Sequence, residues 1–274
     1  MAAAVTGWWE KVKCSGAEFR GRVWFKMSGA ELWLDDSAFA APVMVESALD
    51  QSPGRPGSPA STRLLLRSLR GTDAEHLTLV DVDLSRCEIA GLRRPELLRL
   101  VGRCVFASMP RGWCLRWGWL PWQWTARQAL FEEHLWRRST DAPTPRAGWA
   151  APDPDEKVVV VGPDRLAVMY RQLRAVLEDA RNEPGAADLY YGEMEMRRAA
   201  ARRGAGWGER WLLGGYWLVS GYGLRASRSL AGLTGLIVVA AVMLRYKGFP
   251  GVTPGFGQCV LYAAGSVVSL GRLT

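Results

Sequence analysis

The stretch "LTLVDVDLSRCEIAG", Leu77 to Gly91, decides the fold of the N-terminal part of this chain. Its large apolar residues Leu79, Leu84 and Ile89 are five positions apart, and polar residues stand between them. This spacing matches neither the 3.6-residue period of a helix nor the two-residue period of a plain strand. It is typical of a chain that turns a corner every five residues and sends one side chain per side inward. The sequence therefore predicts a β-solenoid.

The same five-residue frame extends over most of the first ninety residues. A stretch rich in Pro, Gly and Ser, "DQSPGRPGSPASTR" at 50–63, interrupts it and is a predicted loop. A small irregular β-domain with alternating strands is the alternative interpretation. The positions in the frame are Cys14, Phe19, Trp24, Gly29, Leu34, Phe39, Met44 and Leu49, and then Leu64, Leu69, Ala74, Leu79, Leu84 and Ile89.

Three short segments carry a more specific pattern, with a small or medium residue two positions before the central apolar one. They are "AEF" at Ala17–Phe19, "VDLSR" at Val82–Arg86 and "CEIAG" at Cys87–Gly91. This pattern resembles the pentapeptide-repeat family, whose members fold as a right-handed four-sided β-helix. The resemblance implies such a helix over residues 1–109. Its flat ladders of side chains suit contact surfaces better than active sites.

Residues 110–162 form a predicted Trp-rich helix followed by a linker. Thr125 is the expected N-cap of a helix ending at Arg138, and Gln128 completes a capping box. Interleaved Trp and Arg can stack on nucleic-acid bases, but no recognised binding motif accompanies them, so nucleic acid is not favoured as a partner. Residues 139–157 are the predicted linker, and Val158–Val161 is a predicted short strand.

Within that helix, Glu132, Glu133 and His134 are adjacent. Adjacent side chains on a helix point about 100° apart, so these three cannot converge on one metal ion. We expect them on a solvated face.

Residues 163–205 are a predicted antiparallel αα-hairpin. Pro163 suits the first helical position, and Leu166, Tyr170, Leu173 and Leu177 follow at helical spacing. "NEPG" at Asn182–Gly185 ends the first helix, and the second is expected to begin near Pro184.

The segment "YRQLRAVLEDARNEPGAADLYYGEMEMRR", Tyr170 to Arg198, is the most distinctive in the chain. It resembles a stretch of bacterial membrane proteins that join pentapeptide repeats to a C-terminal membrane region. Some of these proteins end in a two-helix ion-channel module, and actinobacterial relatives are often labelled "membrane-associated oxidoreductase". The resemblance implies membrane attachment.

The candidate residues of this hairpin motif are expected to be structural. Glu193 and Glu195 diverge on a helix and cannot share a catalytic role, whereas Glu193 can pair with Arg197 at i+4. Tyr190 and Met194 are expected to pack the hairpin. The hairpin-motif residues are Tyr170, Tyr190, Tyr191, Glu193 and Arg197.

Residues 206–247 hold a predicted interfacial segment and one transmembrane helix at about 225–247, and 248–274 are an apolar tail. The charge-free run Ser229–Leu244 is flanked by basic and aromatic residues that can sit at lipid headgroups. Basic residues are more numerous before this run than after it. This bias predicts a single-pass protein of the cell inner membrane with its bulk in the cytoplasm. The candidate membrane-interface residues are Trp211, Trp217, Arg225, Arg228, Arg245, Tyr246 and Lys247.

"SGYG" at Ser220–Gly223 resembles the core of a potassium-channel filter. A filter needs an outer and an inner spanning helix around it, and nothing upstream of Trp211 is apolar enough to be the outer one. We interpret "SGYG" as an elbow before the anchor. Residues 257–273 are apolar and short enough for a re-entrant pore helix.

Composition favours an interaction protein over an enzyme. The 274 residues carry a net charge of +8 and 14 Trp, which fits contact with an anionic membrane surface. No dinucleotide fingerprint, P-loop or Cys cluster is present, so we assign no catalytic, cofactor-binding or metal-binding residues and no cofactor. The five cysteines are interpreted as reduced thiols.

The predicted function is that of a membrane-anchored, pentapeptide-repeat-like scaffold or interaction protein. Its partners are membrane lipid and an unidentified protein, with self-association through the predicted transmembrane helix. The alternatives are a truncated ion-channel-like subunit and a membrane-associated oxidoreductase.

Overall fold

The computed structural model divides the chain into two compact units, 1–204 and 205–274. It describes residues 2–7, 10–48, 63–110, 113–116, 120–123, 127–139, 149–151, 159–204, 207–220, 222, 226–248 and 255–270. The predicted loop at 50–63 and the predicted linker at 139–157 lie almost entirely outside these ranges, and so do Gly221 and Gly223.

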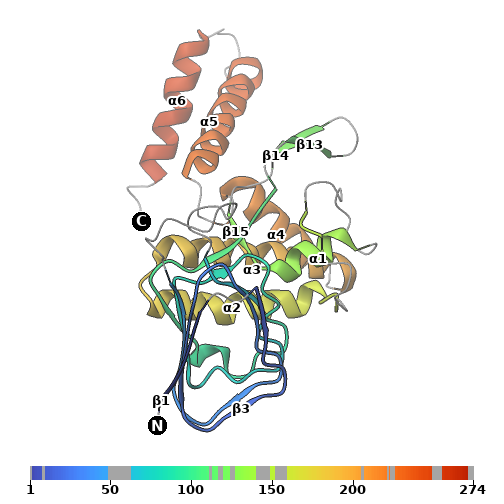
Figure 1. Ribbon diagram of the computed structural model, residues 1–274. Helices are drawn as coiled ribbons and strands as arrows, with labels where there is room; N and C mark the ends of the chain where they lie inside the picture. The colour runs from blue at the N-terminus through green and yellow to red at the C-terminus, as the bar shows by residue number, and fades with distance from the viewer. Residues whose placement is uncertain are drawn as a thin grey trace. The chain divides into compact units, whose positions relative to one another are not determined.

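Parallel strands of the first unit stack into a β-solenoid of about four turns (Figure 1). Ala2 pairs with Arg22 and Val23 with Val43, so the first turns repeat after twenty residues. One stack is β1 (Ala2–Gly7), β4 (Arg22–Met27), β7 (Val43–Ser47), β9 (Leu77–Val80) and β11 (Arg99–Val101). A second is β2 (Lys11–Lys13), β5 (Glu31–Trp33), β8 (Leu65–Ser68), β10 (Asp83–Leu84) and β12 (Val105–Ser108), closed by the antiparallel β15 (Gln128–Ala129).

The third stack is short, β3 (Glu18–Phe19) on β6 (Ala38–Phe39), and a bridge between Asp73 and Arg93 forms farther along the chain. The described solenoid strands thus fall into three stacks of unequal length. A 3₁₀ turn, η1 (Pro95–Leu97), precedes β11. Outside the stacks, β13 (Trp113–Arg116) and β14 (Leu120–Gln123) pair as an antiparallel hairpin that the sequence analysis did not predict.

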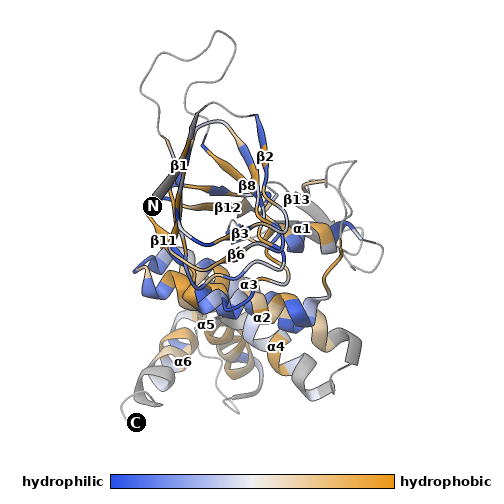
Figure 2. Cartoon of the chain, turned by 60° about the horizontal axis from the view of Figure 1, so that its bottom comes forward, coloured by the Kyte–Doolittle hydropathy of each residue, from blue (hydrophilic) through white to orange (hydrophobic). Residues whose placement is uncertain are grey.

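The five-residue frame is confirmed where it was clearest. Leu79, Leu84 and Ile89 are all buried in the solenoid core. The frame is wrong at Trp24 and Met44, which point outward. Both lie in the middle of long strands, where alternation sends the residues on either side of them inward instead. Figure 2 shows both hydrophobic and hydrophilic colours along the solenoid strands.

One corner of the solenoid depends on left-handed backbone. Gly16, Asp36, Gly71 and Gly91 all have positive φ, at 69°, 51°, 68° and 86°. The backbone N–H of Asp36 donates to the carbonyl of Arg70 at 2.7 Å, which joins this corner in successive turns. At Gly71 the φ of 68° favours glycine, and an added Cβ would require the exposed Asp36 carboxylate to move.

Three helices close the end of the solenoid that carries its last turns. They are α1 (Phe131–Arg138), α2 (Pro163–Asp179) and α3 (Glu183–Gly204). The helices α2 and α3 pack against each other as the predicted hairpin, and α2 also contacts η1 and β11. Solenoid and hairpin share one hydrophobic core.

The predicted start of α1 was wrong. The helix begins at Phe131 with Leu130 at its N-cap, while Gln128 belongs to β15. Gln128 pairs with Ser108 across β12, so the chain is extended where a first helical turn was expected. Thr125 lies outside the described residues, and Val159–Val161 form no strand.

The second unit is helical. It contains α4 (Trp207–Ser220), α5 (Ala226–Met243) running into a π-helical turn η2 (Leu244–Gly248), and α6 (Phe256–Leu270), with α5 packed against both α4 and α6. Within the described ranges, none of the helices combines enough length with enough apolar character to cross a bilayer. The transmembrane helix predicted at 225–247 is therefore not supported. A helix does occupy this range, but its charge-free run Ser229–Leu244 is shorter than the roughly 20 residues that a span needs.

Candidate functional site

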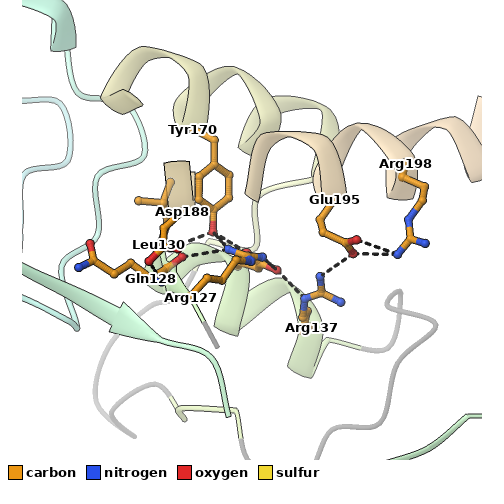
Figure 3. Close-up of polar contacts among 9 residues, drawn as sticks. Arg127, Gln128, Leu130, Arg137, Tyr170, Asp188, Glu195 and Arg198 are labelled. Atoms are coloured by element: carbon orange, nitrogen blue, oxygen red, sulfur yellow. Dashed lines mark hydrogen bonds and ion pairs between the residues drawn. The ribbon is translucent and has the colours of Figure 1, made fainter. Parts of the chain in front are cut away.

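A buried polar cluster lies between α1 and the α2/α3 hairpin (Figure 3). Glu133 is its centre. Arg127 Nη2 donates to the two Glu133 oxygens at 2.8 and 2.7 Å, and Arg137 Nε donates to Oε1 at 2.7 Å. The Tyr170 hydroxyl donates to Oε2. We call Arg127, Glu133, Arg137 and Tyr170 the polar hub.

The polar hub connects four elements that are distant in sequence. The Tyr170 hydroxyl, on α2, accepts from the backbone N–H of Leu130 at 2.9 Å and from Arg127 Nη1 at 3.3 Å. Arg137, on α1, lies 3.8 Å from a carboxylate oxygen of Glu195 on α3. The hub therefore joins the end of β15 to α1, α2 and α3.

Burial and charge set the protonation of the hub. Burial alone would raise the pKa of Glu133, but Arg127 and Arg137 outweigh it and hold that pKa at about 2. Burial and the adjacent Glu133 carboxylate raise the pKa of Tyr170. The pKa of Arg127 is raised, because Glu133 and Tyr170 outweigh its desolvation. The hub thus holds an ionised carboxylate and a neutral tyrosine.

Gly192 on α3 faces the ring of Tyr170. A Cβ at this position would lie 2.5 Å from Cε1 of Tyr170, and the ring is held in place by its hydroxyl contacts. Glycine is therefore required for α3 to approach α2 this closely.

Glu132, the neighbour of Glu133, joins α1 to the solenoid. Its Oε1 accepts the backbone N–H of Ile89 and, at 2.8 Å, that of Ala90, while Oε2 is buried with no hydrogen-bond partner. Burial raises its pKa to about 7, and the nearby Glu88 carboxylate adds to the shift, against the two N–H groups that favour the charged form.

This arrangement predicts a pH dependence that Glu132→Gln should remove. Below about pH 4.5, Glu132 is protonated in both the folded and unfolded chain; as pH rises to 7, only the unfolded chain releases its proton, so stability falls. The loss is on the order of 2–3 kcal/mol. The glutamine variant keeps an acceptor for the N–H groups of Ile89 and Ala90. Its free energy of unfolding should therefore equal that of the wild type at pH 4.5 and exceed it at pH 8. Urea unfolding across this pH range measures the difference.

Glu178→Gln is the control for that series, because Glu178 is exposed on α2. Its profile should run parallel to that of the wild type. A Glu132→Gln profile with the wild-type slope would show that Glu132 does not carry the effect.

His134 points away from the contacts of Glu132 and Glu133, toward Trp149 and Ala150. Its Nδ1 accepts the backbone N–H of Ala150 at 3.1 Å, and its ring meets Trp149 edge-on with centroids 5.0 Å apart. Burial lowers the pKa of His134 to about 4, so the ring is neutral at physiological pH. The expectation that Glu132, Glu133 and His134 form a solvated face was wrong, because all three are buried.

The chemistry of this cluster is structural. The hub side chains are buried and bind one another, so a substrate has no acceptor or nucleophile to meet there. Among the described residues, no group of three or more His, Cys, Asp or Glu side chains is arranged to hold a metal ion. Cys14, Cys87, Cys104 and Cys259 are free cysteines.

One ion pair predicted for the hairpin motif is confirmed. Arg197 Nη2 lies 2.8 Å from Glu193 Oε1, which is the expected i+4 pair. Tyr190 lies under the guanidinium of Arg174, and Tyr191 is buried beside Arg127. The helical spacing predicted Tyr170 as a packing residue but not its hydroxyl contacts, because Arg127 and Glu133 belong to no periodic pattern.

The membrane-interface residues divide into two groups. Trp211, Arg245 and Tyr246 are exposed, whereas Trp217 is buried in the second unit. Arg225 lies outside the described residues, and the side chains of Arg228 and Lys247 are likewise not described.

No protein-family model, curated protein or solved structure matches this chain.

Proposed function

We propose that this chain is a membrane-attached scaffold, in which the C-terminal helices associate with lipid and the β-solenoid offers a surface for protein contacts. A single observation carries the proposal, namely which residues of the second unit are buried and which are exposed. In α5 and α6, the residues described as buried are the small Ala241, Cys259 and Ala263, and the buried aromatics of the unit, Trp217 and Tyr222, lie outside these two helices. The large apolar residues Leu236 and Leu261 are 62% and 75% exposed.

This distribution is the reverse of a water-soluble helical hairpin, in which large apolar side chains fill the space between helices. Helices in lipid instead pack through small residues and present large apolar side chains to acyl chains. Figure 2 shows the predominantly hydrophobic colour of α5. The exposed large apolar residues of the unit are Trp211, Leu212, Tyr216, Leu230, Leu233, Leu236, Val238, Val239, Val242, Met243, Tyr246, Phe256, Leu261 and Tyr262.

The scaffold part of the proposal rests on the first stack of the solenoid. The outward residues of its strands include Trp24 and Met44, which are register partners, and Val101 farther along. The Trp24 ring donates to Glu46 at 3.0 Å and lies under Lys26, so the ring is held in place on the surface. A flat, ordered strand face with exposed apolar residues suits a protein contact.

Two finer parts of the proposal come from the sequence. The first is membership of the pentapeptide-repeat family, which is supported by a turn of twenty residues, equal to four repeats of five. The second is a single crossing of the inner membrane, with most of the chain in the cytoplasm. A hairpin inserted from one side of the membrane is compatible with the same attachment. No contact among the described residues favours the channel-like subunit or the oxidoreductase, so neither is proposed.

Truncation after Gly204 tests the attachment. The core cluster that unites solenoid and hairpin lies wholly within residues 1–204, so this part should fold alone. We expect it in the soluble fraction, whereas the full chain should pellet with membranes and stay there in high salt, because salt screens charge attraction but not apolar burial. Fractionation with immunoblotting measures both.

A full-length variant, Leu236→Gln with Leu261→Gln, separates lipid contact from folding. Both side chains point away from the helix packing, so the hairpin should keep its helix content while losing membrane retention. Retention equal to that of the wild type, or a full chain released by high salt, would overturn the attachment.

A further inference from the structure

Three arginines of the α2/α3 hairpin are gathered around one carboxylate. Arg171 Nε lies 3.0 Å from Glu193 Oε1, Arg197 Nη2 lies 2.8 Å from the same oxygen, and Arg174 Nη1 lies 3.2 Å from Oε2. The Glu193 side chain is only 2% exposed, while those of Arg171, Arg174 and Arg197 are 52%, 27% and 39% exposed. A buried acid thus fixes three partly exposed guanidinium groups, which we call the arginine trio.

The arginine trio carries an excess of positive charge. Glu178 is the other carboxylate in ionic contact with it among the described residues, 3.2 Å from Arg174. Three cations therefore face two carboxylates. A guanidinium has five N–H donors in a planar fork, and each arginine gives one nitrogen to Glu193. Arg174 gives a second nitrogen to Glu178, so the donors left for an acceptor from outside are mainly those of the more exposed Arg171 and Arg197, and the fork geometry matches phosphate oxygens in particular.

One member of the trio, Arg197, lies near the end of the first unit in the sequence. Arg197 precedes Gly204, the last residue of α3, by seven residues, which is about 10 Å along the helix axis. The chain then enters the C-terminal unit with its exposed apolar residues. Along the chain, Arg197 therefore shortly precedes the part that, in the proposed function, meets the membrane.

We propose that Arg171, Arg174 and Arg197 bind the phosphate groups of anionic lipids. This inference rests on the proposed membrane attachment and adds a lipid preference to it. Apolar burial by the C-terminal helices supplies attachment to any bilayer, while the trio favours a negatively charged one. Each arginine near such a surface contributes about a fivefold gain in binding.

Vesicle flotation of the full-length protein tests the proposal. The vesicles are phosphatidylcholine alone, or phosphatidylcholine mixed with phosphatidylglycerol. The variant Arg171→Gln with Arg197→Gln keeps Arg174 as the partner of Glu193. It should lose about 25-fold in binding to the mixed vesicles and little on phosphatidylcholine. The matched control, Arg20→Gln with Arg22→Gln, removes the same charge from exposed solenoid positions and should bind as the wild type does.

The outcomes separate the two proposals. Failure of the wild type to bind either vesicle overturns the membrane attachment itself. Equal wild-type binding to both vesicles, or an equal loss in the solenoid control, overturns the lipid preference alone. Abolition of the preference by inorganic phosphate at low concentration would assign the trio to a free anion instead.

A second measurement does not depend on the variant folding. The preference of the wild type for phosphatidylglycerol should disappear in high salt, because the arginines are exposed and their attraction is screened. Binding to phosphatidylcholine should remain. A preference that survives high salt would contradict a role for exposed arginines.

Discussion

Replacing Leu84 by aspartate is expected to unfold the solenoid. Leu84 is 2% exposed in β10 and is the register partner of Phe106 in β12, so a carboxylate there would be buried without a partner. The expected loss is about 5 kcal/mol or more, which approaches the whole stability of an ordinary domain. Far-ultraviolet circular dichroism and urea unfolding of the detergent-solubilised chain measure it.

Val101→Asp is the matched control, since it places the same charge on a strand of the same solenoid. Val101 is 49% exposed in β11, and its aspartate stays in water, so the midpoint should move by less than about 1 kcal/mol. A Leu84→Asp chain that unfolds at the wild-type urea concentration would show that this position does not point into the core.

Glu133→Gln is expected to cost about 3–5 kcal/mol, the range for removing one partner of a buried ion pair. The glutamine keeps the size of the side chain, but Arg127 and Arg137 would remain buried without the charge that compensates them. Much of this loss comes from two buried arginine charges that no carboxylate would compensate. Urea unfolding followed by tryptophan fluorescence gives the value.

The pH dependence distinguishes a charge effect from a packing effect. The pKa of Glu133 is depressed to about 2, so the stability it contributes is present above about pH 4.5 and is lost as pH falls through 2. The cost of Glu133→Gln should therefore shrink in acid. Glu178→Gln, which removes an exposed pair with Arg174, should cost under about 0.5 kcal/mol. A cost that stays constant down to pH 2 would contradict the electrostatic account.

The five-residue spacing predicted the core positions of those solenoid turns that are built from short strands. The frame found Leu79, Leu84 and Ile89 because short strands and tight corners repeat their own geometry. It failed at Trp24 and Met44, where a longer strand imposes a period of two within the turn. The left-handed corner at Gly16, Asp36, Gly71 and Gly91 was missed, since the spacing changes across the interruption at 50–63.

The surroundings of α1 could not be predicted in this way. Glu132, Glu133 and His134 do point in different directions, as the helical geometry requires. Each direction nevertheless ends in a partner supplied by another part of the chain: the solenoid corner at Ala90, the hub residue Tyr170, and Trp149. Because α1 is covered on three sides, these polar side chains are buried, and the sequence of the helix alone does not indicate which other segments cover it.

The closure of the solenoid by helices that follow it determines when the protein can fold during synthesis. Its first turns leave the ribosome long before α2, which packs on η1 and β11, has been made. Each turn of a solenoid contacts only its neighbours and a terminal turn needs a cap, so the last turns stay uncovered until α2 and α3 have been made. We therefore expect nascent chains stalled before α2 to be protease-sensitive and to recruit chaperones. Chains stalled after α3 should be resistant, at the moment when the apolar C-terminal helices begin to emerge.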